Sequence, residues 1–287
     1  MKVQRRSSFA EAWMRLKKNK LAMVALVIVC LLILTAIFAD LITPYENAIA
    51  NNAAAKYAKP SAEHWFGCDN LGRDLFARVI HGSRVSLLLG FGATAVATVI
   101  ASLLGSAAAF IGGKFDAVVM RLVDILSSIP SILLSLAIAA GFGRGLPQLV
   151  ISIAIGSLPG YIRIVRSTVL GIASQEYIEA AKAVGISTRS IIVSQILPNA
   201  LSTILVQATM MVSANILSGT MLSFLGLGVP VPRPEWGAIM SDGLDYIRYA
   251  SHLVIFPTIF IAITALSINI LGDGLRDAFD PRLKGKA

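Results

Sequence analysis

The chain has 287 residues, of which 56% are hydrophobic and only 14% are charged, with a formal net charge of +9. Soluble domains carry about 25% charged residues, so this composition excludes an ordinary soluble protein and places the chain in a membrane. The basic residues stand beside apolar runs, which the positive-inside rule explains better than nucleic-acid binding does. The two cysteines, Cys30 and Cys68, lie in an apolar run and in a polar loop. We therefore expect no disulfide.

The N-terminal segment, residues 1–20, is polar and basic, and its apolar Phe9, Trp13 and Leu16 recur at helical spacing. This pattern predicts a helix lying on the inner leaflet. The uncharged run that follows, 21–39, is long enough to cross the hydrocarbon core. It is longer than the apolar region of a signal peptide, so we expect an uncleaved first span within 21–42.

A polar loop, 43–83, follows the first span and contains the motif His-Trp-Phe-Gly-Cys-Asp-Asn-Leu-Gly-Arg-Asp over 64–74. Trp65 and Phe66 are expected to anchor the loop at the membrane interface. Asp69 or Asn70 is expected to cap a helix that runs from about residue 71 to 83.

Metal-ligating residue types also occur in this loop: His64, Cys68 and Asp69. One such group without further ligands is weak evidence, so we expect no metal site in the chain and assign Cys68 as a free thiol.

Five further spans are expected after the loop, in the apolar runs 85–111, 117–140, 146–162, 190–232 and 251–271. Small residues along 85–111 predict close helix packing. Pro130 predicts a kink in the third span, as Pro257 does in the sixth. Arg121 and Asp124 stand three residues apart and can pair on one helix face. The run 190–232 is too long for one crossing and also holds a re-entrant or surface segment.

A polar island, Glu-Ala-Ala-Lys-Ala-Val-Gly over 179–185, separates the fourth and fifth spans. Its composition favours a short helix, which Gly185 ends in a left-handed conformation, and Ser187 can cap the next helix. The two alanines and the glycine leave one face bare, so a partner could approach closely. A plain surface helix joining two spans is the alternative interpretation.

A second interrupted stretch, 222–249, combines Leu-Ser-Phe-Leu-Gly-Leu-Gly with three prolines and Glu-Trp-Gly, and it is too broken for one helix. We expect it to fold against the outer mouth and help to receive substrate, with simple interfacial packing as the alternative. Its candidate residues are Phe224, Gly226, Gly228, Trp236 and Gly237.

Topology follows from the basic residues. With six spans and the N-terminus and island inside, seventeen of the 25 Lys and Arg residues fall in inner segments. The positive-inside rule therefore predicts that both termini and the island are cytoplasmic.

The island resembles the EAA loop of the membrane subunits of ABC importers. The matching residues are Glu179, Ala180, Ala181, Gly185, Leu197 and Pro198, while Gln195 stands where that pattern often has isoleucine. The motifs at 64–74, 222–237 and the C-terminus resemble signatures of dipeptide/oligopeptide-type permeases, with Cys68 at a usual threonine position. The resemblance covers nearly the whole chain and is weakest at 1–20 and 45–60.

The resemblance implies an all-α polytopic membrane protein with six transmembrane helices and the type I ABC-importer permease fold. The permease core would span 84–273, the coupling loop about 176–190 and a cytoplasmic tail 274–287. The family also implies four partners: a second homologous permease, two ABC ATPases that bind ATP and Mg²⁺, and an extracytoplasmic substrate-binding protein. The location would be a bacterial or archaeal inner membrane. Di- or oligopeptides are the expected substrate class, and nickel or another small solute is the alternative.

Several features are absent from the sequence. It contains no Gly-x-x-x-x-Gly-Lys-Ser/Thr phosphate loop, its three histidines form no catalytic set, and no carboxylate lies deep in an apolar run. We therefore expect neither an enzyme nor a chain with its own cofactor. A secondary transporter or channel and a membrane-embedded enzyme are the other classes considered. A pore subunit powered by another chain explains the island and these absences together.

Overall fold

The computed structural model describes residues 8–279, and the side chains from residue 10 onward. The side chain of Phe9 and the tail 280–287 therefore lie outside the described part of the chain. Over this range the regular secondary structure is all helical, and one isolated β-bridge joins Cys68 and Asp74 in the irregular loop before α5. The helices are α1 (Ser8–Lys18), α2 (Lys20–Ile37), α3 (Ala39–Ile42), α4 (Tyr45–Ile49), η1 (Ala53–Ala55), α5 (Leu75–Ile111), α6 (Gly113–Ser127), α7 (Ser131–Phe142), α8 (Leu146–Ala173), α9 (Glu176–Ala183), α10 (Thr188–Ile191), η2 (Ile192–Ile196), α11 (Leu197–Leu222), η3 (Ser223–Leu227), α12 (Trp236–Leu244) and α13 (His252–Phe279).

Five helical stretches in the described part are long and apolar enough to cross a membrane, and the α6–α7 pair can supply a sixth span. This agrees with the prediction of six spans in an all-α chain. The third span differs from the prediction, because α6 and α7 meet at 88° across a break rather than a kink. Pro130 lacks an N–H and disfavours helical geometry at Ile129, so the helix stops and restarts.

Close packing of α5 on α8 forms the centre of the largest core cluster. A Cβ at Gly105 would lie 3.0 Å from the carbonyl oxygen of Ile162, so the small residues predicted to allow close packing do so. Polar side chains also join the helices, since Asn215 donates to Thr94 at 2.9 Å and the hydroxyl of Tyr161 donates to a carbonyl of α11 at 2.9 Å.

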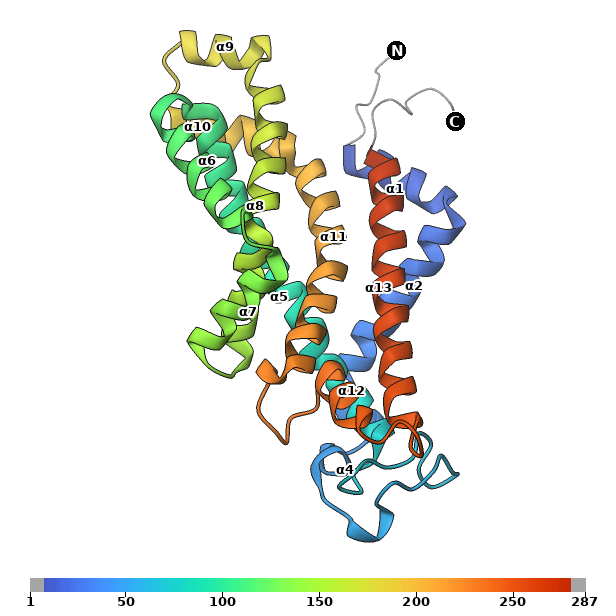
Figure 1. Ribbon diagram of the computed structural model, residues 1–287. Coiled ribbons are helices and arrows are strands. Elements are labelled where there is room, and N and C mark those ends of the chain that lie inside the picture. The colour runs from blue at the N-terminus through green and yellow to red at the C-terminus, as the bar shows by residue number, and fades with distance from the viewer. Residues whose placement is uncertain (1–7, 280–287) are drawn as a thin grey trace.

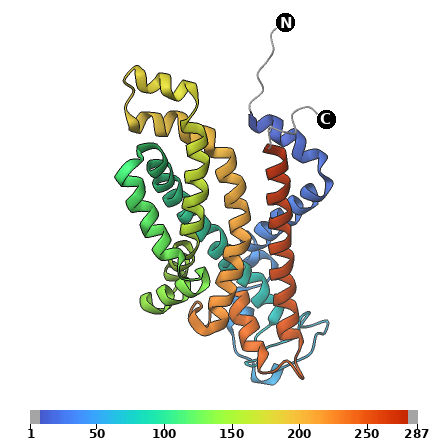
Figure 2. The same cartoon turned by 45° about the horizontal axis from the view of Figure 1, so that its top comes forward.

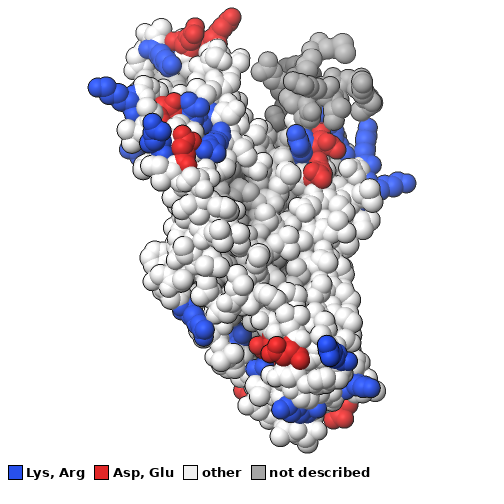
Figure 3. Space-filling view, in the orientation of Figure 1, with Lys and Arg blue, Asp and Glu red and all other residues white. Residues whose placement is uncertain are grey.

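The two ends of the molecule differ in what they carry. α1, α9, α10 and the C-terminal end of α13 lie at one end, while α4 and α12 lie at the other (Figures 1 and 2). Charged side chains gather at both ends and leave an uncharged band between them (Figure 3). Such a band is the surface that lipid tails require.

Several predicted boundaries are corrected by the structure. α5 begins at Leu75, and its N-cap is Asp74, which accepts from the N–H of Ala77 at 2.8 Å, rather than Asp69 or Asn70. The fourth span continues to Ala173 and the last to Phe279. The helix α1 has amphipathic spacing as predicted, but Leu16 is buried and would lie 3.2 Å from a Cβ at Gly274 of α13.

Candidate functional site

The first candidate site is the EAA segment, residues 176–198, which comprises α9, α10, η2 and the start of α11. It forms a helical hairpin beyond the end of α8 (Figure 1). The prediction of a short helix, a glycine turn and a capped second helix is confirmed. Gly185 has φ 79°, and the hydroxyl of Ser187 accepts from the N–H of Ser190 at 3.3 Å.

The turn at Gly185 is a Schellman motif. The N–H of Ile186 donates to the carbonyl of Ala181 at 3.1 Å, and the N–H of Gly185 donates to the carbonyl of Lys182 at 3.0 Å. This pair of bonds satisfies carbonyls that the end of α9 leaves free, and it requires a left-handed residue at position 185. A Cβ built on Gly185 would meet nothing within 4 Å, so only the backbone conformation selects glycine here.

The two faces of α9 have opposite roles. Ile178 and Ala181 are buried and belong to the main core cluster. Tyr177, Ala180 and Val184 are exposed, Val184 to 75%. Positions 177, 180 and 184 share one helix face, because residues three and four apart are neighbours. The bare face expected from Ala180 is therefore present, whereas Ala181 points into the protein.

Glu179 is exposed and forms no ion pair with any residue that the structure describes. The sequence offers four basic neighbours as partners that could hold the shape of this loop, namely Arg163, Arg166, Lys182 and Arg189, and none of them pairs with Glu179 in the described structure. Arg163 and Arg166 of α8 bind carboxylates of α6 instead. Lys182, a third candidate, lies over the ring of Phe110 at 4.6 Å from its centroid. The carboxylate of Glu179 remains available on the surface.

Two ion pairs brace the base of the EAA segment by tying α6 to α8. Arg166 donates to both carboxylate oxygens of Asp116 at 2.6 Å, and Arg163 donates to Asp124 at 2.7 Å. The predicted pairing of Asp124 with Arg121 is therefore wrong. The bidentate geometry makes the Asp116 pair the stronger one. The partners lie 50 residues apart in the sequence, which gives no local signal for this brace.

Leu197 and Pro198 lie where the EAA segment re-enters the helical bundle. Pro198 cannot donate to the carbonyl four residues earlier and crowds it, so the preceding turn widens. The N–H of Leu197 bonds to the carbonyl of Ile192, five residues back, and 192–196 form a π turn. Leu197 is half-buried and Pro198 is exposed.

The second candidate site is the Trp-Gly segment, residues 223–250, at the opposite end. Here Trp236 is fully buried, and its indole N–H donates to the carbonyl of Val79 at 2.9 Å. A Cβ at Gly237 would lie 2.5 Å from the carbonyl oxygen of Thr220, so only glycine fits. These contacts favour the packing interpretation of Trp236 over direct contact with substrate.

Glu235 carries a buried carboxylate that the sequence analysis did not single out. Its carboxylate is fully buried and caps α12, accepting from the N–H groups of Gly237 at 2.8 Å and Ala238 at 2.9 Å and from the hydroxyl of Ser86 at 3.1 Å. Burial raises the pKa of Glu235, and these donors offset only part of that effect. Glutamate is uncommon at an N-cap, so local capping rules do not find it.

The glycine-rich start of the Trp-Gly segment turns the chain away from α11. Gly226 has φ 82°, and Gly228 is buried beside Ser223. Phe224 is half-buried, and its carbonyl accepts from the hydroxyl of Ser241 at 3.1 Å. Its contact with α12 fits the expected fold-back of this segment onto the end of the bundle.

The polar loop closes the same end. Phe66 stacks on Phe256 with ring centroids 4.0 Å apart, while Trp65 is 64% exposed. Cys68 is fully buried, and burial, with the nearby Asp74, raises the pKa of its thiol to about 11. Cys68 is a free cysteine as expected, but its burial removes it from contact with solvent.

Potential metal-ligating atoms of His64, Cys68 and Asp74 lie within 4.8 Å of one another, with Asp74 in the place expected for Asp69. Nδ1 of His64 and a carboxylate oxygen of Asp74 are already hydrogen-bonded at 2.8 Å, which fixes the loop to the start of α5. We assign this contact a structural role.

Spanning helices, a polar hairpin at one end and a packed, broken segment at the other define a membrane permease subunit. The methionine ABC transporter MetNI, solved in inward-facing conformations, has the same fold. It superposes with a TM-score of 0.60 at 22% identity, over 71% of this chain and 97% of the MetNI chain. A second crystal form of that transporter gives a TM-score of 0.58. The fold is thus that of a type I ABC-importer permease.

Residues 82–285 match the family described as "Binding-protein-dependent transport system inner membrane component", and this chain belongs to that family. Residues 7–60 match the "N-terminal TM domain of oligopeptide transport permease C". Similar relatives include the dipeptide transport system permease protein DppC of Alkalihalophilus pseudofirmus, 45% identical over 97% of this chain and 91% of the relative. The glutathione transport system permease protein GsiD of Escherichia coli is 41% identical over 98% and 93%.

Proposed function

We propose that this chain forms half of the translocation pathway of an ATP-driven importer for small peptides. The relatives with 41–45% identity are named for a dipeptide and for glutathione, and both of these compounds are short peptides. This shared chemistry favours peptides over nickel as the substrate class. A secondary transporter or channel does not account for the family match.

The observation that carries the coupling role is the exposed stripe on α9. Tyr177, Ala180 and Val184 present small and apolar surface on a hairpin whose base is braced by Arg166 and Asp116. An ATPase docking on this stripe would bury it, while the brace would transmit the resulting force to α6 and α8. ATP and Mg²⁺ would bind in the two ATPase subunits, and the other half of the pathway would come from a second permease.

For the orientation, we propose that the end carrying α1, α9 and the end of α13 is cytoplasmic. The charge asymmetry of the sequence supports this assignment. The polar loop and the Trp-Gly segment would then face an extracytoplasmic binding protein. Because Cys68 is buried, Ala62→Cys on the exposed part of the loop is the better site for labelling from outside.

The function is tested by uptake of a labelled dipeptide into cells that express this chain with its companion permease, ATPases and binding protein. Uptake should require the ATPases, and unlabelled dipeptide or glutathione should compete, whereas Ni²⁺ should not. Ala180→Asp should abolish uptake at matched expression, and Ala180→Ser serves as the control of similar size. Uptake of nickel without uptake of peptide would overturn the substrate assignment.

A further inference from the structure

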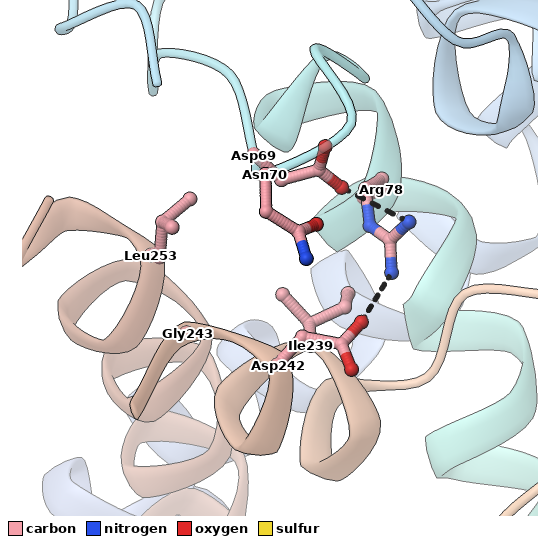
Figure 4. A pocket seen from close by; sticks show the side chains of 7 residues that line it. All are labelled: Asp69, Asn70, Arg78, Ile239, Asp242, Gly243 and Leu253. Atoms are coloured by element: carbon pink, nitrogen blue, oxygen red, sulfur yellow. Dashed lines mark ion pairs between the residues drawn. The ribbon is translucent and has the colours of Figure 1, made fainter. Parts of the chain in front are cut away.

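A cluster of four charged residues, Asp69, Arg73, Arg78 and Asp242, joins the polar loop and the start of α5 to α12. Figure 4 shows three of them, Asp69, Arg78 and Asp242. Arg73 and Arg78 are each no more than 3% exposed. Asp69 binds both of them, at 2.6 Å from Nε of Arg73 and 3.2 Å from Nη1 of Arg78. Asp242 also faces both guanidinium groups, but at 3.7 Å and 3.5 Å. The two carboxylates are therefore held very differently.

Asp69 is fixed in place, because its other oxygen accepts from the N–H groups of Leu71 at 2.8 Å and Arg73 at 3.0 Å. Asp242 is loosely held: its side chain is 43% exposed, and its contacts with the arginines are longer than hydrogen bonds. A charge-assisted pair with good geometry has N···O distances of about 2.7–2.9 Å. The carboxylate of Asp242 is therefore the replaceable member of the cluster.

Unused hydrogen-bonding capacity remains beside it. Nε of Arg78 and Oδ1 of Asn70 are buried without a hydrogen-bond partner among the described residues, and Nη1 of Arg78 has only its 3.2 Å ion-pair contact with Asp69, which lacks hydrogen-bond geometry. Asn70, Arg78 and Asp242 line a small void of about 10 Å³, which is room for about one water molecule. A buried guanidinium N–H without a hydrogen-bond partner is unfavourable. A further hydrogen-bond acceptor beside Arg78 would therefore stabilise this site.

An open crevice of about 360 Å³ reaches the cluster from the surface. Asn70 and Asp242 line both the crevice and the inner void, so Asp242 stands between them. Arg73 also lines the crevice. If Asp242 swings outward, an acceptor that enters through the crevice reaches both guanidinium groups. Arginine suits carboxylates in particular, because its planar fork bonds both oxygens.

We propose that Arg73 and Arg78 form a carboxylate-binding site at the extracytoplasmic mouth, closed by Asp242 and taken by the C-terminal carboxylate of a peptide substrate. This inference rests on the proposed function for the orientation and for the ligand. Asp242 acts as an internal substitute for that ligand, and its displacement frees α12 from the polar loop. The crevice has the volume of a small-ligand subsite.

The test is thiol labelling of Asp242→Cys in the complete transporter, in right-side-out vesicles without binding protein or ATP. The thiol would face two guanidinium groups that only Asp69 offsets. An anionic methanethiosulfonate should therefore react about tenfold faster than a cationic one, as expected for one unbalanced charge at roughly 4 Å. A dipeptide with a free carboxylate should slow the reaction, and the same dipeptide as its C-terminal amide should not. Acetate should protect only at far higher concentration.

Asp245→Cys is the matched control, since Asp245 is exposed on the same segment, three residues further on. It should show neither the preference for the anionic reagent nor protection by peptide, and unaltered chain supplies the blank for Cys30 and Cys68. Equal rates with both reagents at position 242 would overturn the site. Equal protection by the free and amidated dipeptides, or by acetate alone, would overturn the peptide ligand. Labelling requires no transport, so the uptake assay tests the proposed function separately.

A second variant, Asp242→Asn, guards against misfolding of the cysteine variant, because asparagine keeps the shape and removes the competing charge. Its KM for uptake of a free-carboxylate dipeptide should fall several-fold at unchanged expression. An unchanged KM would contradict the role of Asp242 as an internal competitor.

Discussion

The EAA segment and the Trp-Gly segment interrupt the apolar spans with similar residues, yet they place them in opposite ways. The EAA segment turns Tyr177, Ala180 and Val184 outward, and an open space surrounds Gly185. The Trp-Gly segment turns its signature inward, with Trp236 fully buried and Gly237 against a neighbouring backbone. A signature of small and aromatic residues can therefore mark a docking surface or a packing junction. Burial distinguishes the two.

The largest expected effect lies in the Trp-Gly segment. Trp236→Ala should destabilise the chain by about 3–5 kcal/mol, because it removes a fully buried indole and its hydrogen bond to Val79. We expect loss of folded protein and of assembly, measured by thermal unfolding of the purified transporter. Tyr177→Ala, on the exposed face of α9, is the contrasting variant and should leave stability unchanged. If the Trp236→Ala protein were stable and had lost only uptake, the result would favour direct contact of this segment with substrate over a packing role.

The next largest effects are expected at Ala180 and Ala181, two neighbouring residues of α9. Substitutions at these positions test docking and packing separately. Ala181→Asp should destabilise the chain by roughly 2 kcal/mol or more, because the charge would be buried in the core cluster. Ala180→Asp should leave unfolding unchanged and weaken ATPase binding at least about tenfold. Thermal unfolding and ATPase pull-down at matched expression measure the two effects. If Ala180→Asp retained full binding, the exposed face would not be the docking surface.

Substitution of Gly185 is expected to lower the free energy of unfolding by less, and it tests the backbone conformation of the turn alone. Gly185→Val should cost roughly 1–2 kcal/mol, since a β-branched residue resists φ 79°. It should also tilt α10 and uncouple ATP hydrolysis from uptake. Gly185→Asn is the control, because asparagine tolerates the left-handed conformation and its side chain meets open space. Equal activity of both variants would show that the shape of the turn is unimportant.

The last prediction is a pH dependence that comes from Glu235 of the Trp-Gly segment. Because burial raises the pKa of Glu235 above its ordinary value of 4.5, the folded chain holds this proton more tightly than the unfolded chain does. The stability from this group is therefore complete below that value and is lost as pH rises through the folded pKa, at up to about 1.4 kcal/mol per pH unit. Unfolding temperatures measured between pH 5 and 8 should show the decline. Glu235→Gln should flatten it, and an unchanged slope would contradict the assignment.

The sequence predicts the features that depend on local chemistry. Long apolar runs must become helices in a membrane, because no other structure satisfies their backbone groups there. The cap at Ser187 and the left-handed Gly185 also follow from neighbouring residues. The orientation of Trp236 does not, since an aromatic residue near an interface can face lipid or protein. Its partner, Val79, lies 157 residues away. The ion pair of Arg166 with Asp116 and the contact of Arg78 with Asp242 escape prediction for the same reason. Pro130 predicts a kink, but the sequence does not give the size of the bend at this proline.

The unbroken length of α5 has a mechanical consequence. Its 37 residues extend for about 56 Å, from Arg78 near one end to Phe110, beneath Lys182, near the other. If α5 tilts as a rigid body about a point near its middle, its two ends move in opposite directions. A tilt of about 5° would carry each tip sideways by between roughly 2 and 3 Å, in opposite directions. Such a stroke is comparable with the 3.5 Å separation of Arg78 and Asp242. A force applied at α9 would thus change the distance between Arg78 and Asp242 at the opposite end, and α5 alone would transmit it.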